Sequence, residues 1–209
     1  VKSPCVVARR VMDAPHMLLG GDGAIRFART VGVPEHYPIS DRALERFAKV
    51  KTYLNGDRSG NWAPNWKTAD PAAYWNFPTD LRDALGPSDT VGAVARDAQG
   101  GFAAAVSTGG TSIMLLGRVG DSPILGCGLY VGPHGAVTTT GDGEEIMRRV
   151  LAKEVYDLMA SGQSAQAACE AGVAQYDRER FTIGIIAVGR DGHGAADNRT
   201  MPWAVVVAG

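Results

Sequence analysis

The fold is decided by residues 90–108, which read TVGAVARDAQGGFAAAVST. Apolar and β-branched residues dominate 90–96 and 102–108, and each run has the length of a strand. Residues 97–101 between them are small, polar or glycine, as in a tight turn. The stretch therefore predicts a β-hairpin.

The register of this hairpin depends on the length of its loop. If the loop is residues 98–100, with Gly100 in the left-handed conformation, Thr108 lies opposite Thr90. A loop of two or four residues puts Ser107 there instead. A hydroxyl faces Thr90 in either case, at the spacing of a cross-strand pair.

The residues before the hairpin have a helical pattern. Helices are predicted after Pro4 and up to Pro15, from the glycines at 20–23, and from Asp41 to near Gly56. Residues 57–89 hold three of the four tryptophans among Asn, Pro, Asp and Gly. We expect this stretch to be an exposed, mobile connection.

The residues after the hairpin predict further helices and strands. They comprise one long amphipathic helix over 144–160, a helix from Ser164 to about Gln175, strands at 181–188 and 194–198 around the turn 190–193, and a closing strand at 205–207. Strands, then helices, then strands again indicate a sheet layered with helices, an α/β fold.

Composition excludes several classes of function. The chain of 209 residues has a net charge of -1, so no basic surface indicates nucleic acid or an anionic membrane as a partner. No run approaches the roughly 20 apolar residues of a membrane-spanning helix. Cys5, Cys127 and Cys169 lie far apart without metal-ligand spacing, and we interpret them as small buried residues. We expect no cofactor and no metal.

Thr90 is a candidate nucleophile. A threonine hydroxyl needs a base, and the residue's own α-amine can serve when threonine is N-terminal, because its pKa is about 8. Thr90 follows the expected connection and begins the first strong strand, so a cut after Asp89 would leave the hydroxyl and the new amine on a rigid support. The alternative is that Thr90 is only a β-branched strand residue.

Two glycine-rich stretches supply candidate partners. Residues 117–123 place Arg118 and Asp121 three positions apart, where they could hold the α-carboxylate and α-ammonium of an amino acid. The alternative is a mutual surface ion pair.

The second stretch, residues 138–143, runs into the start of the long helix. There the Thr140 hydroxyl and the Gly141 N–H could form an oxyanion hole. The alternative is ordinary helix capping by Asp142.

Together these motifs resemble the threonine asparaginase family of N-terminal-nucleophile hydrolases, which contains glycosylasparaginase and the isoaspartyl peptidase/L-asparaginases. The resemblance is closest to glycosylasparaginase. It is carried by SDTVGAVA at 88–95, STGG at 107–110, GRVGDSPI at 117–124 and TGDGE at 140–144, with VARRVM at 7–12 and GDGA at 21–24 upstream.

The resemblance implies a four-layer αββα sandwich that cuts itself between Asp89 and Thr90. Residues 1–89 would be the α-subunit and 90–209 the β-subunit, together forming one domain, and such α/β units would pair into a homo-oligomer. Thr90 would be nucleophile and base, and Thr108 would hydrogen-bond to it. Arg118 and Asp121 would bind the aspartyl main-chain groups, with Thr140 and Gly141 as the oxyanion hole.

The sequence departs from the family pattern in two places. The family begins with several dozen residues of strands and helices that have no counterpart here, so either the sequence is truncated or the chain is a reduced relative lacking N-terminal strands. Ser88 stands where a histidine is usual, which could slow self-cleavage.

The resemblance predicts an amidohydrolase that cleaves the side-chain amide of a small asparagine derivative and releases aspartate. Asp89 before the nucleophile favours a glycosylasparaginase-like substrate, because the plant-type members usually have glycine there. One alternative is an isoaspartyl peptidase/L-asparaginase that takes β-aspartyl peptides. The other is an uncut, non-catalytic relative that only binds aspartate.

Overall fold

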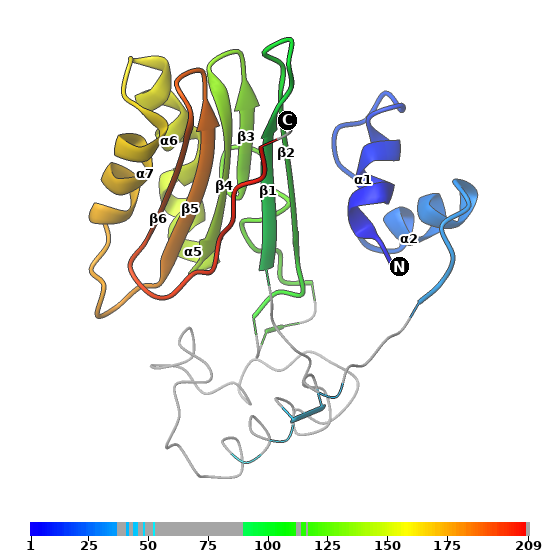
Figure 1. Ribbon diagram of the computed structural model, residues 1–209. Helices are drawn as coiled ribbons and strands as arrows, with labels where there is room; N and C mark the ends of the chain where they lie inside the picture. Colours follow the sequence, from blue (N-terminus) through cyan, green and yellow to red (C-terminus); the bar gives the residue numbers. More distant parts are fainter. Residues whose placement is uncertain are drawn as a thin grey trace. The chain divides into compact units, whose positions relative to one another are not determined.

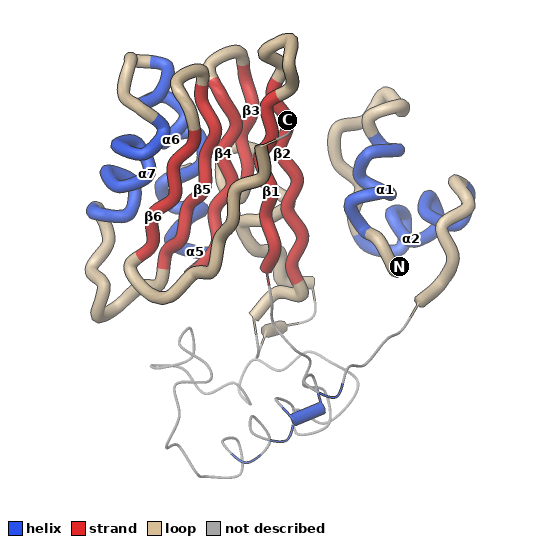
Figure 2. Tube along the Cα trace, in the orientation of Figure 1, coloured by secondary structure: helices blue, strands red, loops and turns tan. Residues whose placement is uncertain are grey.

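The chain divides into two compact units in the computed structural model, which describes residues 1–36, 41, 44, 45, 48, 52, 90–111, 114, 115 and 117–207. One unit comprises Val1–Asp89 and Thr108–Arg118, and the other Thr90–Ser107 and Val119–Gly209. The described residues form five helices and six strands, labelled in Figures 1 and 2.

The first unit contains helices α1 (Pro4–Val11) and α2 (Gly21–Thr30), both as predicted. Proline fits the first turn of α1 because the N–H that it lacks would have no partner within the helix. Of the helix predicted from Asp41, residues 41, 44, 45, 48 and 52 are helical, and its other positions lie outside the described residues, as does the connection predicted at 57–89.

The second unit contains two antiparallel sheets. The predicted hairpin is present as β1 (Thr90–Arg96) and β2 (Phe102–Thr108), of which the last residue, Thr108, is counted with the first unit. A four-stranded sheet has the order β3 (Leu129–Gly132), β4 (Gly135–Gly141), β5 (Ile183–Gly189) and β6 (His193–Asp197). Strands β5 and β6 were predicted from the sequence, whereas the hairpin of β3 and β4 was not.

Three helices, α5 (Gly143–Arg149), α6 (Leu151–Ala160) and α7 (Ala165–Ala174), connect β4 to β5. The prediction of a single helix over 144–160 was wrong, because Val150 adopts the left-handed conformation and separates α5 from α6. The first N–H groups of α6 bond outside the helix: Ala152 donates to the Cys127 carbonyl at 3.2 Å and Lys153 to the Gly126 carbonyl at 2.9 Å.

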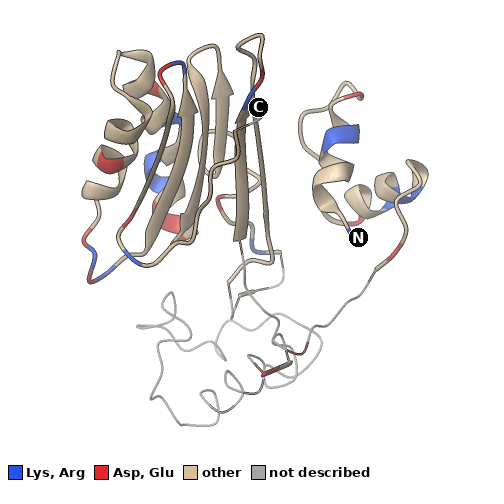
Figure 3. Ribbon diagram, viewed as in Figure 1, with Lys and Arg blue, Asp and Glu red and all other residues tan. Residues whose placement is uncertain are grey.

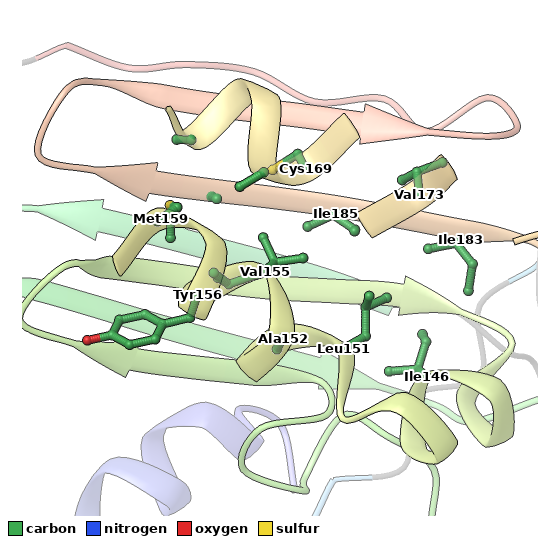
Figure 4. Close-up of a cluster of buried hydrophobic side chains, with 14 of the residues drawn as sticks. Ile146, Leu151, Ala152, Val155, Tyr156, Met159, Cys169, Val173, Ile183 and Ile185 are labelled. Atoms are coloured by element: carbon green, nitrogen blue, oxygen red, sulfur yellow. The ribbon is translucent and has the colours of Figure 1, made fainter. Parts of the chain in front are cut away.

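The hydrophobic core lies between the helices and one face of the four-stranded sheet. Leu151 and Val155 of α6 and Cys169 of α7 are fully buried in one cluster with Ile185 of β5 (Figure 4). Val137 of β4 belongs to the same buried cluster. Burial of one such aliphatic side chain contributes about 1.5–3 kcal/mol, so this packing fixes the sheet on which the candidate site is built.

The opposite face of the same sheet carries β1, which lies against β4 and β5. The second unit therefore stacks helices, a four-stranded sheet and the β1–β2 hairpin in three successive layers. This confirms the predicted α/β class, and both of its sheets are antiparallel. The second helical layer of an αββα sandwich stays a prediction.

Two further predictions were wrong. Residues 205–207 form no strand: Val206 is 94% exposed, and an apolar run without a strand partner makes no ladder. Cys5 is exposed on α1, whereas Cys127 and Cys169 are buried as expected.

Candidate active site

Thr90 lies on the face of β1 that is turned toward the four-stranded sheet. Accessibility alternates along β1, with Thr90, Gly92 and Val94 partly covered and Val91 and Ala93 exposed. A Cβ on Gly92 would lie 2.6 Å from the Thr138 hydroxyl oxygen of β4. Alternate strand residues share a face, so Thr90 points toward the sheet as Gly92 does.

Hydrogen bonds at the other end of β1 give its direction relative to β4. The Arg96 guanidinium donates to the Arg190 carbonyl at 2.7 Å, and Arg190 Nε donates to the Pro133 carbonyl at 3.2 Å, in the turn that precedes β4. The end of β1 thus lies near the beginning of β4, and the two strands run in opposite directions.

Because β1 and β4 run in opposite directions, the position of Thr90 along β4 can be counted from the Gly92–Thr138 contact. Two residues back from Gly92 and two residues on from Thr138 lead to Thr90 and Thr140, which therefore lie at the same level. In Figure 1, β1 begins at the end of the sheets at which β4 passes into α5. The structure brings the candidate nucleophile and the candidate oxyanion-hole residues to one end of the second unit.

Gly141 has a backbone conformation that other residues rarely adopt. Its φ is +133°, and a Cβ would overlap the Thr182 carbonyl oxygen. Next to it, Asp142 N–H donates to that carbonyl at 2.8 Å, and the Asp142 carboxylate accepts the Thr182 N–H at 2.7 Å. The alternative of side-chain capping is therefore not what the structure shows, because the carboxylate makes no cap to α5.

The Gly141 N–H is directed away from β5. Along β4, the Thr139 N–H donates to Gly128 on the β3 side, whereas the Asp142 N–H donates to Thr182 on the β5 side. Amide directions alternate along a strand, so the Gly141 N–H points to the β3 side. The last pair of that ladder is Leu129 with Thr138, which leaves Gly141 beyond the end of β3.

Asp121 is buried in the loop that leads into β3, at 7% exposure. Its carbonyl accepts the N–H groups of Ile124 at 2.9 Å and Gly128 at 3.0 Å. Burial, and then the negative charge of Asp121, raise the pKa of the Cys127 thiol. Asp121 is therefore not an exposed surface residue, and its role in holding the α-ammonium of an amino acid stays a prediction.

The loop of Asp121 is also tied to β4. The Thr139 hydroxyl donates to the Cys127 carbonyl at 2.9 Å, and Thr139 is buried. The strand that carries Thr140 and Gly141 therefore also anchors the loop that carries Asp121. Sequence reasoning missed Thr139, although its place in the Thr138–Thr140 run was a signal, since hydroxyls can satisfy loop carbonyls.

Thr108 and Arg118 belong to the other unit, so the structure does not place them relative to Thr90. Within that unit, the Thr108 hydroxyl accepts the Gly110 N–H at 3.0 Å, and Arg118 N–H donates to the Leu115 carbonyl at 3.0 Å. Asp89 lies outside the described residues.

The turn of the β1–β2 hairpin shows which of the possible loop lengths is present. Asp97 N–H donates to the Gly101 carbonyl at 2.9 Å, and Gly100 has a φ of +84°. The loop is therefore residues 98–100, which is the register that favours Thr108 over Ser107 as the partner of Thr90. That pairing stays a prediction.

A metal-binding cluster and a membrane-spanning helix are both absent from the described part of the chain. Within it, no three His, Cys, Asp or Glu side chains gather so that they could hold a metal ion. Its helices also include none with the length and apolar character needed to cross a bilayer.

Comparison with known sequences identifies the class. The sequence model of the family described as asparaginase matches residues 1–208, and the chain belongs to this family.

Similarity to individual relatives extends over several kinds of asparaginase. The chain is 37% identical over 196 residues to a plant-type L-asparaginase of Pyrococcus horikoshii, with 92% of this chain and 60% of the relative covered. It is 37% identical over 213 residues to an isoaspartyl peptidase/L-asparaginase of Xenopus laevis, covering 99% of this chain and 62% of the relative.

A third relative is an N(4)-(beta-N-acetylglucosaminyl)-L-asparaginase of Elizabethkingia miricola, 37% identical over 175 residues, with 83% of this chain and 45% of the relative covered. The chain thus spans less than two thirds of the length of these relatives.

Proposed function

We propose that this protein hydrolyses the side-chain amide of asparagine derivatives, with Thr90 as the N-terminal nucleophile. The observation that carries the proposal is the antiparallel packing of β1 on β4, with Gly92 next to Thr138, because it supports a position of Thr90 on the sheet-facing side near Thr140 and Gly141. Membership of the asparaginase family supports it independently.

The reaction follows from the chemistry of these groups. The free α-amine of Thr90 accepts the hydroxyl proton as Oγ attacks the amide carbon, because an α-amine is largely available as a base near pH 8. The oxyanion receives hydrogen bonds from the Thr140 hydroxyl and the Gly141 N–H. The ammonium of Thr90 then protonates the leaving amine, and water hydrolyses the β-aspartyl ester to aspartate.

Arg118 and Asp121 complete the proposed site by binding the aspartyl main-chain groups. A guanidinium matches the α-carboxylate in a two-pronged hydrogen bond. A buried carboxylate suits the α-ammonium, and the burial of Asp121 supports this role. Thr108 would hold the Thr90 side chain, and the three-residue hairpin loop supports that pairing.

Activation requires that Thr90 becomes N-terminal. We propose that the chain cuts itself after Asp89, giving an α-subunit of residues 1–89 and a β-subunit of residues 90–209. The mature protein would have the αββα architecture and form a homo-oligomer of such α/β units.

The candidate substrates differ in their leaving group, which is either a glycosylamine or else ammonia or an amino acid. Asp89 favours a glycosylamine, as in glycosylasparaginase. Relatives named plant-type L-asparaginase and isoaspartyl peptidase/L-asparaginase are equally similar and cover more of this chain, which favours ammonia or an amino acid.

The test compares three substrates on the purified, self-cleaved protein: N-acetylglucosaminyl-asparagine, a β-aspartyl dipeptide and asparagine. We expect aspartate from the glycosylated substrate, and cleavage of the dipeptide alone would establish the isoaspartyl peptidase instead. Thr90→Ala should lower hydrolysis by at least about a thousandfold, as for loss of other nucleophiles. Binding of aspartate without turnover of any substrate would establish the non-catalytic alternative.

A further inference from the structure

The backbone of residues 181–183, which leads into β5, decides where Gly141 can lie. The Thr182 carbonyl oxygen occupies the space that a Gly141 Cβ would need, so the two peptide units are in direct contact. Gly141 and Ile183 are also partners in the β4–β5 ladder. Movement of this segment would therefore move Gly141.

Asp142 holds the segment from one side. Its N–H donates to the Thr182 carbonyl at 2.8 Å, and its carboxylate oxygen Oδ2 accepts the Thr182 N–H at 2.7 Å. One residue thus satisfies both backbone groups of Thr182. A hydrogen bond to an ionised carboxylate is stronger than one between neutral groups, so this contact is a firm one.

Asn198 holds the same segment from the other side. Its N–H donates to the Ile183 carbonyl at 3.1 Å, its Oδ1 accepts the Ile183 N–H at 2.9 Å, and its Nδ2 donates to the Phe181 carbonyl at 3.0 Å. Together with Asp142, Asn198 forms what we call the 181–183 clamp, five hydrogen bonds to three consecutive residues.

Glycine has no side chain to limit rotation of its peptide units, so neighbouring contacts must fix the direction of the Gly141 N–H. The Thr140–Gly141 peptide, which carries this N–H, is held by the pairing of β4 with β5. The next peptide, Gly141–Asp142, is held by the hydrogen bond from the Asp142 N–H to the Thr182 carbonyl. An oxyanion-hole donor acts through being held in place before the charge develops.

We propose that Asp142 and Asn198 are positioning residues, which set the direction of the Gly141 N–H by clamping residues 181–183. The proposal rests on the function proposed above for Gly141. It adds that the carboxylate of Asp142 acts through Thr182 and does not contact substrate.

The test uses Asp142→Ala, Asp142→Asn and Asn198→Ala in the self-cleaved protein, with rates expressed per cleaved chain. Gln166→Ala is the matched control, because the Gln166 amide makes the same kind of two-way contact with the Ala195 backbone, at 3.0 Å in each direction, on the far edge of the sheet.

We expect kcat to fall about tenfold or more in Asp142→Ala and Asn198→Ala while KM changes less than about twofold, since loss of a whole oxyanion donor gives about 10²–10³. Asp142→Asn should recover most of the rate, because its amide oxygen can still accept the Thr182 N–H. Gln166→Ala should keep the wild-type kcat.

The proposal is overturned if Asp142→Ala and Asn198→Ala lose no more kcat than Gln166→Ala, or if these two variants change KM and leave kcat at the wild-type value. If Asp142→Ala does not fold, Asn198→Ala decides the matter by the same comparison of kcat and KM. If the wild type hydrolyses none of the three substrates, the proposed function has failed. Crystal structures of the variants then test the clamp separately, and an unchanged Thr140–Gly141 peptide, which carries the Gly141 N–H, would overturn it.

Discussion

Val150 adopts a backbone conformation that β-branched residues avoid. Its φ is 54° and its ψ is 48°, and its N–H closes α5 by donating to Ile146 and Met147 carbonyls. The left-handed region costs an L-residue roughly 1–2 kcal/mol, and asparagine tolerates it best after glycine. The position is maintained by its surroundings: a Cβ on Gly126 would lie 2.8 Å from Val150 Cγ1.

We therefore predict that Val150→Asn raises the free energy of unfolding by about 0.5–1 kcal/mol. Val150 is 43% exposed, so little buried apolar area is lost. Urea unfolding measures the change. Val150→Ala is the control, since alanine keeps most of the left-handed strain and should give a smaller gain. A lower stability for Val150→Asn than for Val150→Ala would contradict the explanation.

Tyr176 gives a prediction for alkaline pH. It is 8% exposed, and burial, reinforced by Glu154 and Glu145 but opposed by Arg149, raises its pKa to about 12. In the unfolded chain the phenol ionises near pH 10. Between these values the unfolded state loses a proton that the folded state keeps, so rising pH favours unfolding.

Wild-type protein should accordingly lose roughly 2–3 kcal/mol more stability between pH 10 and 12 than Tyr176→Phe, which has no hydroxyl to ionise. Below pH 10 this contribution to the pH dependence is absent. Equilibrium unfolding of both proteins across this range measures the difference, and parallel curves would contradict it.

At the scale of elements, the edge of the four-stranded sheet at β6 is covered by a side chain of α7. The Gln166 amide accepts from the Ala195 N–H and donates to the Ala195 carbonyl, which would otherwise be open to another strand. Close backbone contact supports this arrangement, because a Cβ on Gly194 would lie 2.4 Å from the Ala165 carbonyl group.

Gln166→Ala should lower the free energy of unfolding by about 1–2 kcal/mol, the net value of two hydrogen bonds, and should increase association at high concentration. Urea unfolding and light scattering are the measurements. Gln163→Ala, in the exposed turn after α6, is the matched control and should stay within about 0.5 kcal/mol of wild type. Equal effects of both changes would exclude a special role for Gln166.

Elements that depend on local signals were predictable from sequence. The β1–β2 hairpin follows from strand composition and from Gly100, and α7 from Ser164, whose hydroxyl accepts the Ala167 N–H at 3.2 Å. The break at Val150 was not predictable, because the groups that receive the first N–H bonds of α6 are carbonyls of Gly126 and Cys127, distant in sequence.

In the candidate site, too, the features set by local sequence were predictable and those set by distant residues were not. Its glycine-rich motifs were visible as short patterns, whereas the residues that orient them act over long separations. Arg96 reaches Arg190, and Asp142 reaches Thr182, through bonds that span 94 and 40 positions. The missed strands β3 and β4 are short or rich in Gly and Thr, which hides their strand character.

At the scale of the whole molecule, charge is kept off three of the four strands of the larger sheet. Strands β3, β4 and β5 contain no Lys, Arg, Asp or Glu, and in the second unit the charged residues gather on helices and turns (Figure 3). Asp121 is the buried charged residue among those described. Attraction between opposite charges is stronger away from water, so the burial of Asp121 is compatible with the ammonium group proposed as its ligand.

We predict that the whole chain cuts itself between Asp89 and Thr90. Intact-mass measurement of the wild type should give two polypeptides, residues 1–89 and 90–209, and Thr90→Ala should give one chain of 22.0 kDa. Thr200→Ala, at an exposed threonine outside the candidate site, should be cut like the wild type. A single uncut wild-type chain that still turned over substrate would refute Thr90 as an N-terminal nucleophile.

The contact of Gly92 with Thr138 fixes which face of β1 is turned toward the four-stranded sheet. The face on which the Thr90 hydroxyl lies then depends on whether Thr90 is an even or an odd number of positions from Gly92. Strand residues an even number apart share a side, so the hydroxyl faces the sheet only while one residue separates Thr90 from Gly92. Natural length variation should therefore be tolerated at the Arg96 end, beyond the contact, and selected against between positions 90 and 92. A single inserted residue there would turn the hydroxyl outward while leaving every other part of the fold intact.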